Sequence, residues 1–360
     1  GQLEPPLLQL FPSELVTSPD GSDRVAYSGN FSVGEGAGNF DHLGTPIGDA
    51  AFCDAYLRRR VEKVERVLAA VTSVADTEVA FKVMMYCANY GRVMHLMRTV
   101  PCDAAATALE AFDDKVCATF SDISGIWPTP EQWERATRAT SVGGCGLRSA
   151  ARHSAAAYIA STLATRRRCT EVDGAFAGGS GAVAGPVLDA VAKYNSLLPS
   201  DQSTTLPALA EIAEQGSIQK QLSHKLDRCS FAADLAACPT LADKAQLQSE
   251  AMPGAGDFLD TLPSITLRLA LRPAEFRVEL KRRLLVDVYP CVRPCPLCNA
   301  PLDTRGWHAL RCPCGGDRTR WHHVLRNHFV NLCEGAGLRA EVEPPHLLLP
   351  DPDHPAQESR

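Results

Sequence analysis

Four side chains near the carboxyl end of the chain have the types and the spacing of a metal site. Cys295-Pro-Leu-Cys298 is followed after nine residues by His308 and after three more by Cys312, which gives the pattern C-x2-C-x9-H-x3-C. Zinc in proteins takes four tetrahedral ligands, and a C-x2-C turn presents two thiolates from one short segment. Because four protein ligands leave no position open for a substrate, the sequence predicts a structural Zn²⁺ ion.

Neighbouring thiols and imidazoles leave the exact ligand set open. They are Cys291 in place of Cys295, Cys314 in place of Cys312, and the more distant His322 and His323. A group of reduced cysteines in a loop is the alternative to a metal site. A zinc hydrolase would need an open coordination position and a general base, and the segment shows neither.

The charge of the chain is unevenly distributed around this segment. Residues 265–330 hold 12 Lys/Arg and 5 Asp/Glu, a net charge of +7, whereas residues 1–264 carry −9 and residues 331–360 carry −4. Cations supply salt-dependent affinity for phosphates, and aromatic faces stack on bases. We therefore expect nucleic acid, RNA or DNA, to bind this segment. The candidate residues are Arg282, Arg283, Arg318, Arg320, Trp321, His322 and His323. The alternative is a basic face that contacts only solvent.

The elements that precede the cysteine cluster are predicted to be helical, so the fold class is mainly α. Apolar residues recur at spacings of three and four, and strand signals are few. Two such stripes are Leu57-Val61-Val64-Leu68-Val71 and Leu109-Phe112-Val116-Phe120. Asp76 is a plausible N-cap of a buried helix through Leu96, which includes Val79 and which Pro101 ends. Thr129-Pro130-Glu131 predicts the start of a short helix that carries Trp133.

Two further motifs can be mistaken for catalytic ones. Gly143-Gly-Cys-Gly146 precedes an Ala-rich helix predicted over 148–165, but its spacing matches neither the P-loop nor the dinucleotide fingerprint, so we interpret it as a tight turn. Asp113-Asp114 follows Ala-Phe as the metal-binding pair of reverse transcriptases does. Because Phe112 belongs to a helical stripe, we interpret this pair as acids on a helix surface.

Composition limits the class of protein. The chain of 360 residues is 45% hydrophobic and 22% charged and has no run of 18 apolar residues, so we expect no membrane span. It begins at Gly1 without a basic and apolar leader, and it contains 14 cysteines. We therefore expect an intracellular protein, in the nucleus or cytoplasm, with reduced thiols, and a piece of a longer product.

Several of these motifs occur in an order that resembles non-LTR retrotransposon polyproteins, in the region after the polymerase active site. They are Leu43-Gly-Thr-Pro-Ile-Gly48, the helical stretch 84–98, Gly143–Ala150, and the cysteine cluster that ends at Gly316. In that family, a Leu-Gly-x-Pro-Ile-Gly segment leads from the palm into a helical thumb. A Cys-Cys-His-Cys knuckle then precedes a restriction-like endonuclease. The resemblance covers most of residues 40–345, and it is specific in the order of its motifs.

The resemblance implies a domain organisation and a function. The knuckle of the family corresponds to Cys295, Cys298, His308 and Cys312, and its following basic stretch to Gly315, Gly316, Arg320, His322 and His323. The implied segments are the end of a palm (1–48), a helical thumb-like domain (49–173), a variable helical region (174–265), a basic zinc-knuckle module (266–330) and the start of a nuclease (331–360).

No palm-type Asp-Asp strand precedes Leu43, and Glu341 and Glu343 are candidates for early residues of the nuclease fold. We therefore expect a nucleic-acid-binding piece of a reverse transcriptase protein that is inactive by itself as an enzyme. The alternative is an α-helical protein-interaction module with a structural zinc site, which the negative charge of residues 1–264 favours.

Overall fold

A computed structural model describes residues 39–172, 184–214, 216–267, 269–314 and 317–342. The described chain is mainly helical, which confirms the predicted fold class. Its contacts divide it into two compact units, unit 1 (Gly1–Val286) and unit 2 (Asp287–Arg360). Among the residues so described, no helix combines the length and the apolar character that a membrane crossing requires.

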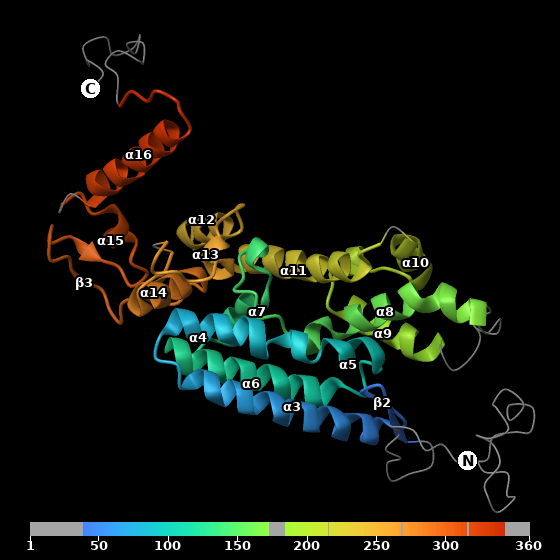
Figure 1. The fold of residues 1–360 in the computed structure, drawn as a ribbon. Helices are drawn as coiled ribbons and strands as arrows, with labels where there is room; N and C mark the ends of the chain where they lie inside the picture. The colour runs from blue at the N-terminus through green and yellow to red at the C-terminus, as the bar shows by residue number, and fades with distance from the viewer. Residues whose placement is uncertain (1–38, 173–183, 215, 268, 315–316, 343–360) are drawn as a thin grey trace, which may run out of the picture. The chain divides into compact units, whose positions relative to one another are not determined.

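Unit 1 begins with a two-stranded antiparallel ribbon, β1 (Phe40–His42) and β2 (Thr45–Ile47), and continues as helices (Figure 1). The α-helices are α3 (Ala50–Thr72), α4 (Thr77–Val83), α5 (Met94–Thr99), α6 (Ala106–Ser124), α7 (Pro130–Thr137), α8 (Ala150–Val172), α9 (Ala184–Ser196), α10 (Leu206–Glu214), α11 (Ile218–Ala237), α12 (Leu241–Glu250), α13 (Asp257–Asp260) and α14 (Pro273–Arg283). Shorter turns are the π-helical η1 (Met84–Ala88) and the 3₁₀ turns η2 (Tyr90–Arg92), η3 (Thr140–Val142) and η5 (Ser200–Gln202).

The described part of unit 2 contains one two-stranded ribbon and two helices. Strands β3 (Arg293–Pro294) and β4 (Pro301–Leu302) pair antiparallel, and α15 (Trp307–Arg311) and α16 (Asp317–Gly335) follow.

The two predicted apolar stripes form the centre of unit 1. Every residue of both stripes is buried on α3 and α6, and these helices lie side by side (Figure 1). The ring of Phe81 on α4 meets that of Phe120 on α6 edge-on, at 6.5 Å between centroids. The ring of Phe276 on α14 also meets the Phe81 ring, at 5.5 Å between centroids. Helix α14 therefore belongs to the core of unit 1, and the unit boundary lies after it, not before it at residue 266 as expected.

The expected division between residues 49–173 and 174–265 also differs from what is found. A second buried cluster joins α8 to α9, α10 and α11, with Ile159, Tyr194 and Leu222 among its members. Because α8 contributes to both this cluster and the first one, the helices on either side of residues 173–183 share one unit. The start of the expected variable region, up to residue 183, and most of the expected palm segment 1–48 lie outside the described residues.

The helix predicted from Asp76 to Leu96 is not continuous. Asp76 caps α4 as predicted, since its carboxylate accepts from the Val79 backbone amide at 3.0 Å. Val79 itself is 38% exposed and not buried as expected. After α4 the helical hydrogen bonds change to the wider π-helical pattern of η1. The helix then stops at Asn89, whose backbone is extended. The side-chain amide of Asn89 donates to the Gly146 carbonyl at 3.1 Å. The spacing of apolar residues cannot reveal this long-range hydrogen bond. The start of α7 is as predicted, with a capping box between Thr129 and Gln132.

The Asp113-Asp114 pair is helical, as predicted, but it is not a surface pair. Asp114 is exposed, whereas Asp113 caps the start of α8. Its carboxylate accepts from the Ser149 hydroxyl at 2.6 Å and from the Ala150 and Ala151 amides at 2.8 and 3.1 Å. Burial raises the pKa of Asp113 to about 6. This acid therefore joins α6 to α8, and α8 begins at Ala150, two residues later than predicted.

The glycine loop is a tight turn, as the sequence indicates. Gly143 and Gly146 have φ angles of 73° and 75°, and a Cβ on Gly144 would lie 2.1 Å from the Arg138 carbonyl oxygen. The Gly146 amide donates to that carbonyl at 2.8 Å. The loop therefore packs against the end of α7, where only glycine leaves enough room.

Arg283, which we expected to bind nucleic acid, is instead a buried structural residue. Its guanidinium pairs with Glu250 at 2.7 Å and donates to the Gly144 and Thr140 carbonyls at 2.7 and 2.6 Å. The side chain is 0% exposed, so no phosphate can reach it. Arg282, the preceding residue, is half-buried. Adjacent helical positions point in different directions, so one run of cations supplies both a surface and a core residue.

We predict that Arg283→Ala destabilises unit 1 by about 3–5 kcal/mol, because it leaves Glu250 as an unpaired buried carboxylate. Chemical denaturation followed by circular dichroism measures this change. Arg282→Ala is the matched control, with an expected change under about 1 kcal/mol. Equal losses for the two variants would contradict the structural role of Arg283.

Candidate metal centre

The four residues predicted from the C-x2-C-x9-H-x3-C spacing meet in unit 2. One ligand atom from each of Cys295, Cys298, His308 and Cys312 lies within 4.8 Å of all the others. Cys295 and Cys312 are buried, and the other two are half-buried. Two segments supply the four atoms, a turn between β3 and β4 and a second one around α15.

The first pair of ligands is presented by a closed turn. The Cys295 amide donates to the Ala300 carbonyl at 2.8 Å, and the Asn299 amide donates back to the Cys295 carbonyl at 2.9 Å. Asn299 has a φ of 62°, a left-handed conformation that asparagine tolerates better than most residues. This geometry brings the Cys298 thiol beside that of Cys295.

The second pair is positioned by a carboxylate. Asp303 accepts from the Trp307 amide at 2.9 Å and from the His308 amide at 2.7 Å, which satisfies free donors in the first turn of α15. These hydrogen bonds lower the pKa of Asp303. Sequence reasoning missed this residue, although a carboxylate just before a short helix is a capping signal. Asp303 therefore orients the backbone that carries His308.

The interatomic distances are close to those around one tetrahedral ion. With metal–sulfur bonds of about 2.3 Å and metal–nitrogen bonds of about 2.0 Å, tetrahedral ligands lie about 3.5–3.8 Å apart. The Cys295 and Cys312 sulfurs are 3.8 Å apart. The Cys298 sulfur and the His308 Nε2 are 3.1 Å apart, which is closer than two ligands of one tetrahedral ion, and all four ligand atoms lie within 4.8 Å of one another. The group can therefore hold a metal ion.

The two buried thiols differ in acidity. Backbone amides of Leu297 and Cys298 donate to the Cys295 sulfur and lower its pKa to about 6. Desolvation raises the pKa of Cys312 to about 11. A bound cation would favour loss of the proton from both thiols.

The alternative ligands lie outside this group. Cys291 and Cys314 are exposed, and neither belongs to the cluster found among the described residues. His322 and His323 are exposed on α16, with their rings 5.7 Å apart. Of the ligands that the sequence left open, the cluster therefore contains only those of the C-x2-C-x9-H-x3-C pattern, among the described residues.

The remaining predicted binding residues are divided between the units. Arg282 and Arg283 belong to unit 1, whereas Arg320, Trp321, His322 and His323 lie exposed on α16 of unit 2. The side chain of Arg318 lies outside the described residues. Trp321 is 66% exposed, so it is a surface aromatic and not a core residue.

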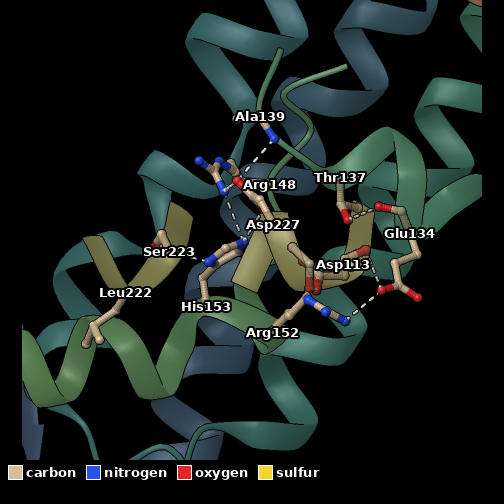
Figure 2. A network of polar contacts seen from close by, with 12 residues as sticks. Asp113, Glu134, Thr137, Ala139, Arg148, Arg152, His153, Leu222, Ser223 and Asp227 are labelled. Atoms are coloured by element: carbon tan, nitrogen blue, oxygen red, sulfur yellow. Dashed lines mark hydrogen bonds and ion pairs between the residues drawn. The ribbon is translucent and has the colours of Figure 1, made fainter. Parts of the chain in front are cut away.

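A second polar cluster, in unit 1, contains the residue types of a hydrolytic triad. His153 on α8 lies between Ser223 and Asp227 on α11 (Figure 2). Its Nδ1 is 3.2 Å from the Ser223 hydroxyl, and its Nε2 is 3.7 Å from an Asp227 oxygen. The sequence did not indicate this cluster, because its members are far apart along the chain and match no motif.

The hydrogen bonds of His153 place its proton on the nitrogen that a catalytic histidine would need to keep unprotonated. Arg148 donates to Asp227 at 2.6 Å and lies 3.2 Å from Nε2 of His153. A guanidinium can only donate, so Nε2 must accept and the proton resides on Nδ1, which then donates to Ser223. A catalytic base must instead accept the serine proton. With His153 only 1% exposed, this cluster joins α8 to α11 and has no access to substrate.

No protein-family model, curated protein or solved structure gives a significant match to this chain. The functional argument therefore depends on the residues and the geometry described above.

We predict that Asp303→Ala weakens metal binding, because α15 loses its cap. A lost cap costs about 0.5–2 kcal/mol, which is about 2- to 30-fold in affinity. Titration with Co²⁺, whose visible absorption reports tetrahedral thiolate coordination, measures the change. Asp287→Ala removes an exposed carboxylate of the same unit and is the control. Equal affinity of Asp303→Ala and the wild type would refute the positioning role.

We predict that His153 makes unit 1 sensitive to acid. Burial, aided by Arg148 and Arg152, lowers its pKa to about 3, whereas an unfolded histidine titrates near 6.5. The unfolded state therefore binds more protons below pH 6.5, so this contribution to stability is lost progressively from pH 6.5 towards pH 3. Relative to His153→Gln, the wild type should lose up to about 1.4 kcal/mol more per pH unit between pH 6 and 4.

Denaturation midpoints across that pH range provide the measurement. His224→Gln removes an exposed imidazole from α11 and serves as the control, with a slope like that of the wild type. Identical slopes for the wild type and His153→Gln would show that the buried imidazole does not remain neutral.

Proposed function

We propose that unit 2 is a zinc-dependent nucleic-acid-binding module, and that the chain is a piece of a retroelement reverse transcriptase protein in which unit 1 corresponds to the thumb. The observation that carries this proposal is the meeting of four ligand atoms within 4.8 Å. The order of the motifs supports the assignment to a retroelement protein, because a helical region precedes a Cys-Cys-His-Cys group in both.

The donor set favours zinc among the common metals. Three thiols and one imidazole are soft and borderline ligands, whereas calcium and magnesium require oxygen. With four protein ligands the ion would be structural and would contribute to folding of the small unit.

Uncompensated cations support binding to a polyanion. Arg293, Arg311 and Arg320 are exposed, and none of them forms an ion pair with a described side chain. By contrast, Asp303 caps α15, and Asp287 lies 3.6 Å from Arg305. These two carboxylates therefore do not pair with the three arginines, whose exposed guanidinium groups are accessible to phosphates. In the parent protein, the thumb would hold the template–primer duplex, and the knuckle would position target DNA or element RNA.

We predict that the zinc-loaded chain binds labelled RNA or DNA with an affinity that falls steeply with salt. Fluorescence anisotropy from low to moderate salt measures the slope, and metal analysis should find one zinc per chain. His308→Ala should lose both the zinc and most of the binding. A combined Arg293→Glu and Arg320→Glu variant should lose binding while retaining zinc.

Arg166→Glu, an exposed arginine on α8 of unit 1, is the matched control for the change in charge. Zinc-free protein with unchanged binding, or a flat response to salt, would overturn the proposal.

A second candidate function, protein interaction, is favoured by one observation. Helix α16 exposes a row of large apolar side chains, each more than half exposed: Trp321, Val324, Leu325, Phe329 and Leu332. An exposed apolar row of this kind is typical of helices that bind partners. Under this alternative, the arginine variants leave partner binding unchanged, whereas Leu325→Asp with Phe329→Asp abolishes it.

A further inference from the structure

Beside the metal centre, unit 2 carries a groove with apolar and aromatic walls. Its lining includes Tyr289, Arg293, Leu297, Leu302, Leu310 and Trp321, next to two of the metal ligands, Cys295 and Cys312. Leu297 and Leu310 are each more than half exposed, so the walls are open to a ligand. The groove therefore provides apolar surface next to the exposed cation Arg293.

The aromatic rings around the groove are partly paired with guanidinium groups. Arg293 lies over the Tyr289 ring at 4.9 Å from its centroid, and Arg311 lies over Trp307 at 5.8 Å. Trp321 has no such cation over its ring among the described residues, and two-thirds of its surface is exposed. A broad indole face is therefore accessible to another flat ring.

The charges at the rim match a chain of phosphates. Arg293 lines the groove, and Arg311 adjoins the lining residues Leu310 and Cys312. Neither arginine forms an ion pair with a described side chain. An aromatic platform beside unpaired cations is the combination that binds single-stranded nucleic acid, since bases stack on the ring and phosphates contact the arginines.

We propose that this groove binds an unpaired nucleobase of a single strand, stacked on Trp321, with the adjacent phosphates at Arg293 and Arg311. The inference rests on the proposed nucleic-acid function and specifies its substrate. In a duplex both faces of each base are covered by neighbours, so Trp321 has no base face to contact. An apolar peptide would contact the walls but would leave both arginines without a partner.

The test compares two probes on the zinc-loaded full chain, an unstructured oligothymidine and a hairpin duplex of equal charge. The wild type is expected to bind the single strand at least tenfold more tightly. Trp321→Ala should weaken single-strand binding about 5- to 150-fold, the range for loss of one stacked base, and change duplex binding less than threefold. Trp321→Phe should restore most of the single-strand affinity.

Trp127→Ala is the matched control, because Trp127 is an exposed tryptophan of unit 1 that does not line the groove. Equal loss of both probes in Trp321→Ala, or no loss of either, would overturn the groove assignment while the nucleic-acid function stands. Binding of a hydrophobic peptide that oligothymidine does not displace would also overturn it. If the wild type binds neither probe at low salt, the proposed function itself fails.

Discussion

Unit 2 has little besides the four side chains of its candidate metal site to hold it together. Its buried apolar cluster within the described residues consists of Cys295, Leu302 and Cys312, and two of those three belong to the candidate site. A core of this size cannot offset the conformational entropy of ordering the chain. Coordination of an ion by these four side chains would supply the missing free energy, since an ion that binds only the folded state stabilises it. The same coordination would hold the groove and the exposed arginines in place.

Unit 1 is stabilised in a different way, by polar side chains placed between helices. Asp113 on α6 caps the start of α8. Asp234 on α11 forms ion pairs of 2.6 Å with both Arg135 and Arg138, at the end of α7. His153 on α8 donates to the Ser223 hydroxyl on α11 at 3.2 Å. Each of these pairs connects residues far apart in the sequence. Such contacts contribute to specifying how helices pack, while the apolar stripes provide most of the driving force for burial.

Local patterns were sufficient to predict much of this architecture. The stripes on α3 and α6, the caps at Asp76 and Thr129, and the ligand spacing all depend on neighbours within a few residues, where helix and turn geometry is regular. The errors concern long-range contacts. Asn89 interrupts a helix because of Gly146, Arg283 is buried because of Glu250 and Gly144, and the His153 cluster brings together distant residues. Neither periodicity nor composition contains that information.

The burial of Arg283 has a mechanical consequence. It lies in the last turn of α14, a few residues before the chain enters unit 2. Its guanidinium is bonded at once to a carboxylate on α12 and to two carbonyls near the glycine loop. These three bonds anchor the last turn of α14 to two other parts of unit 1. A pull on the chain after Val286 would therefore meet an anchored helix end, and not one free to fray.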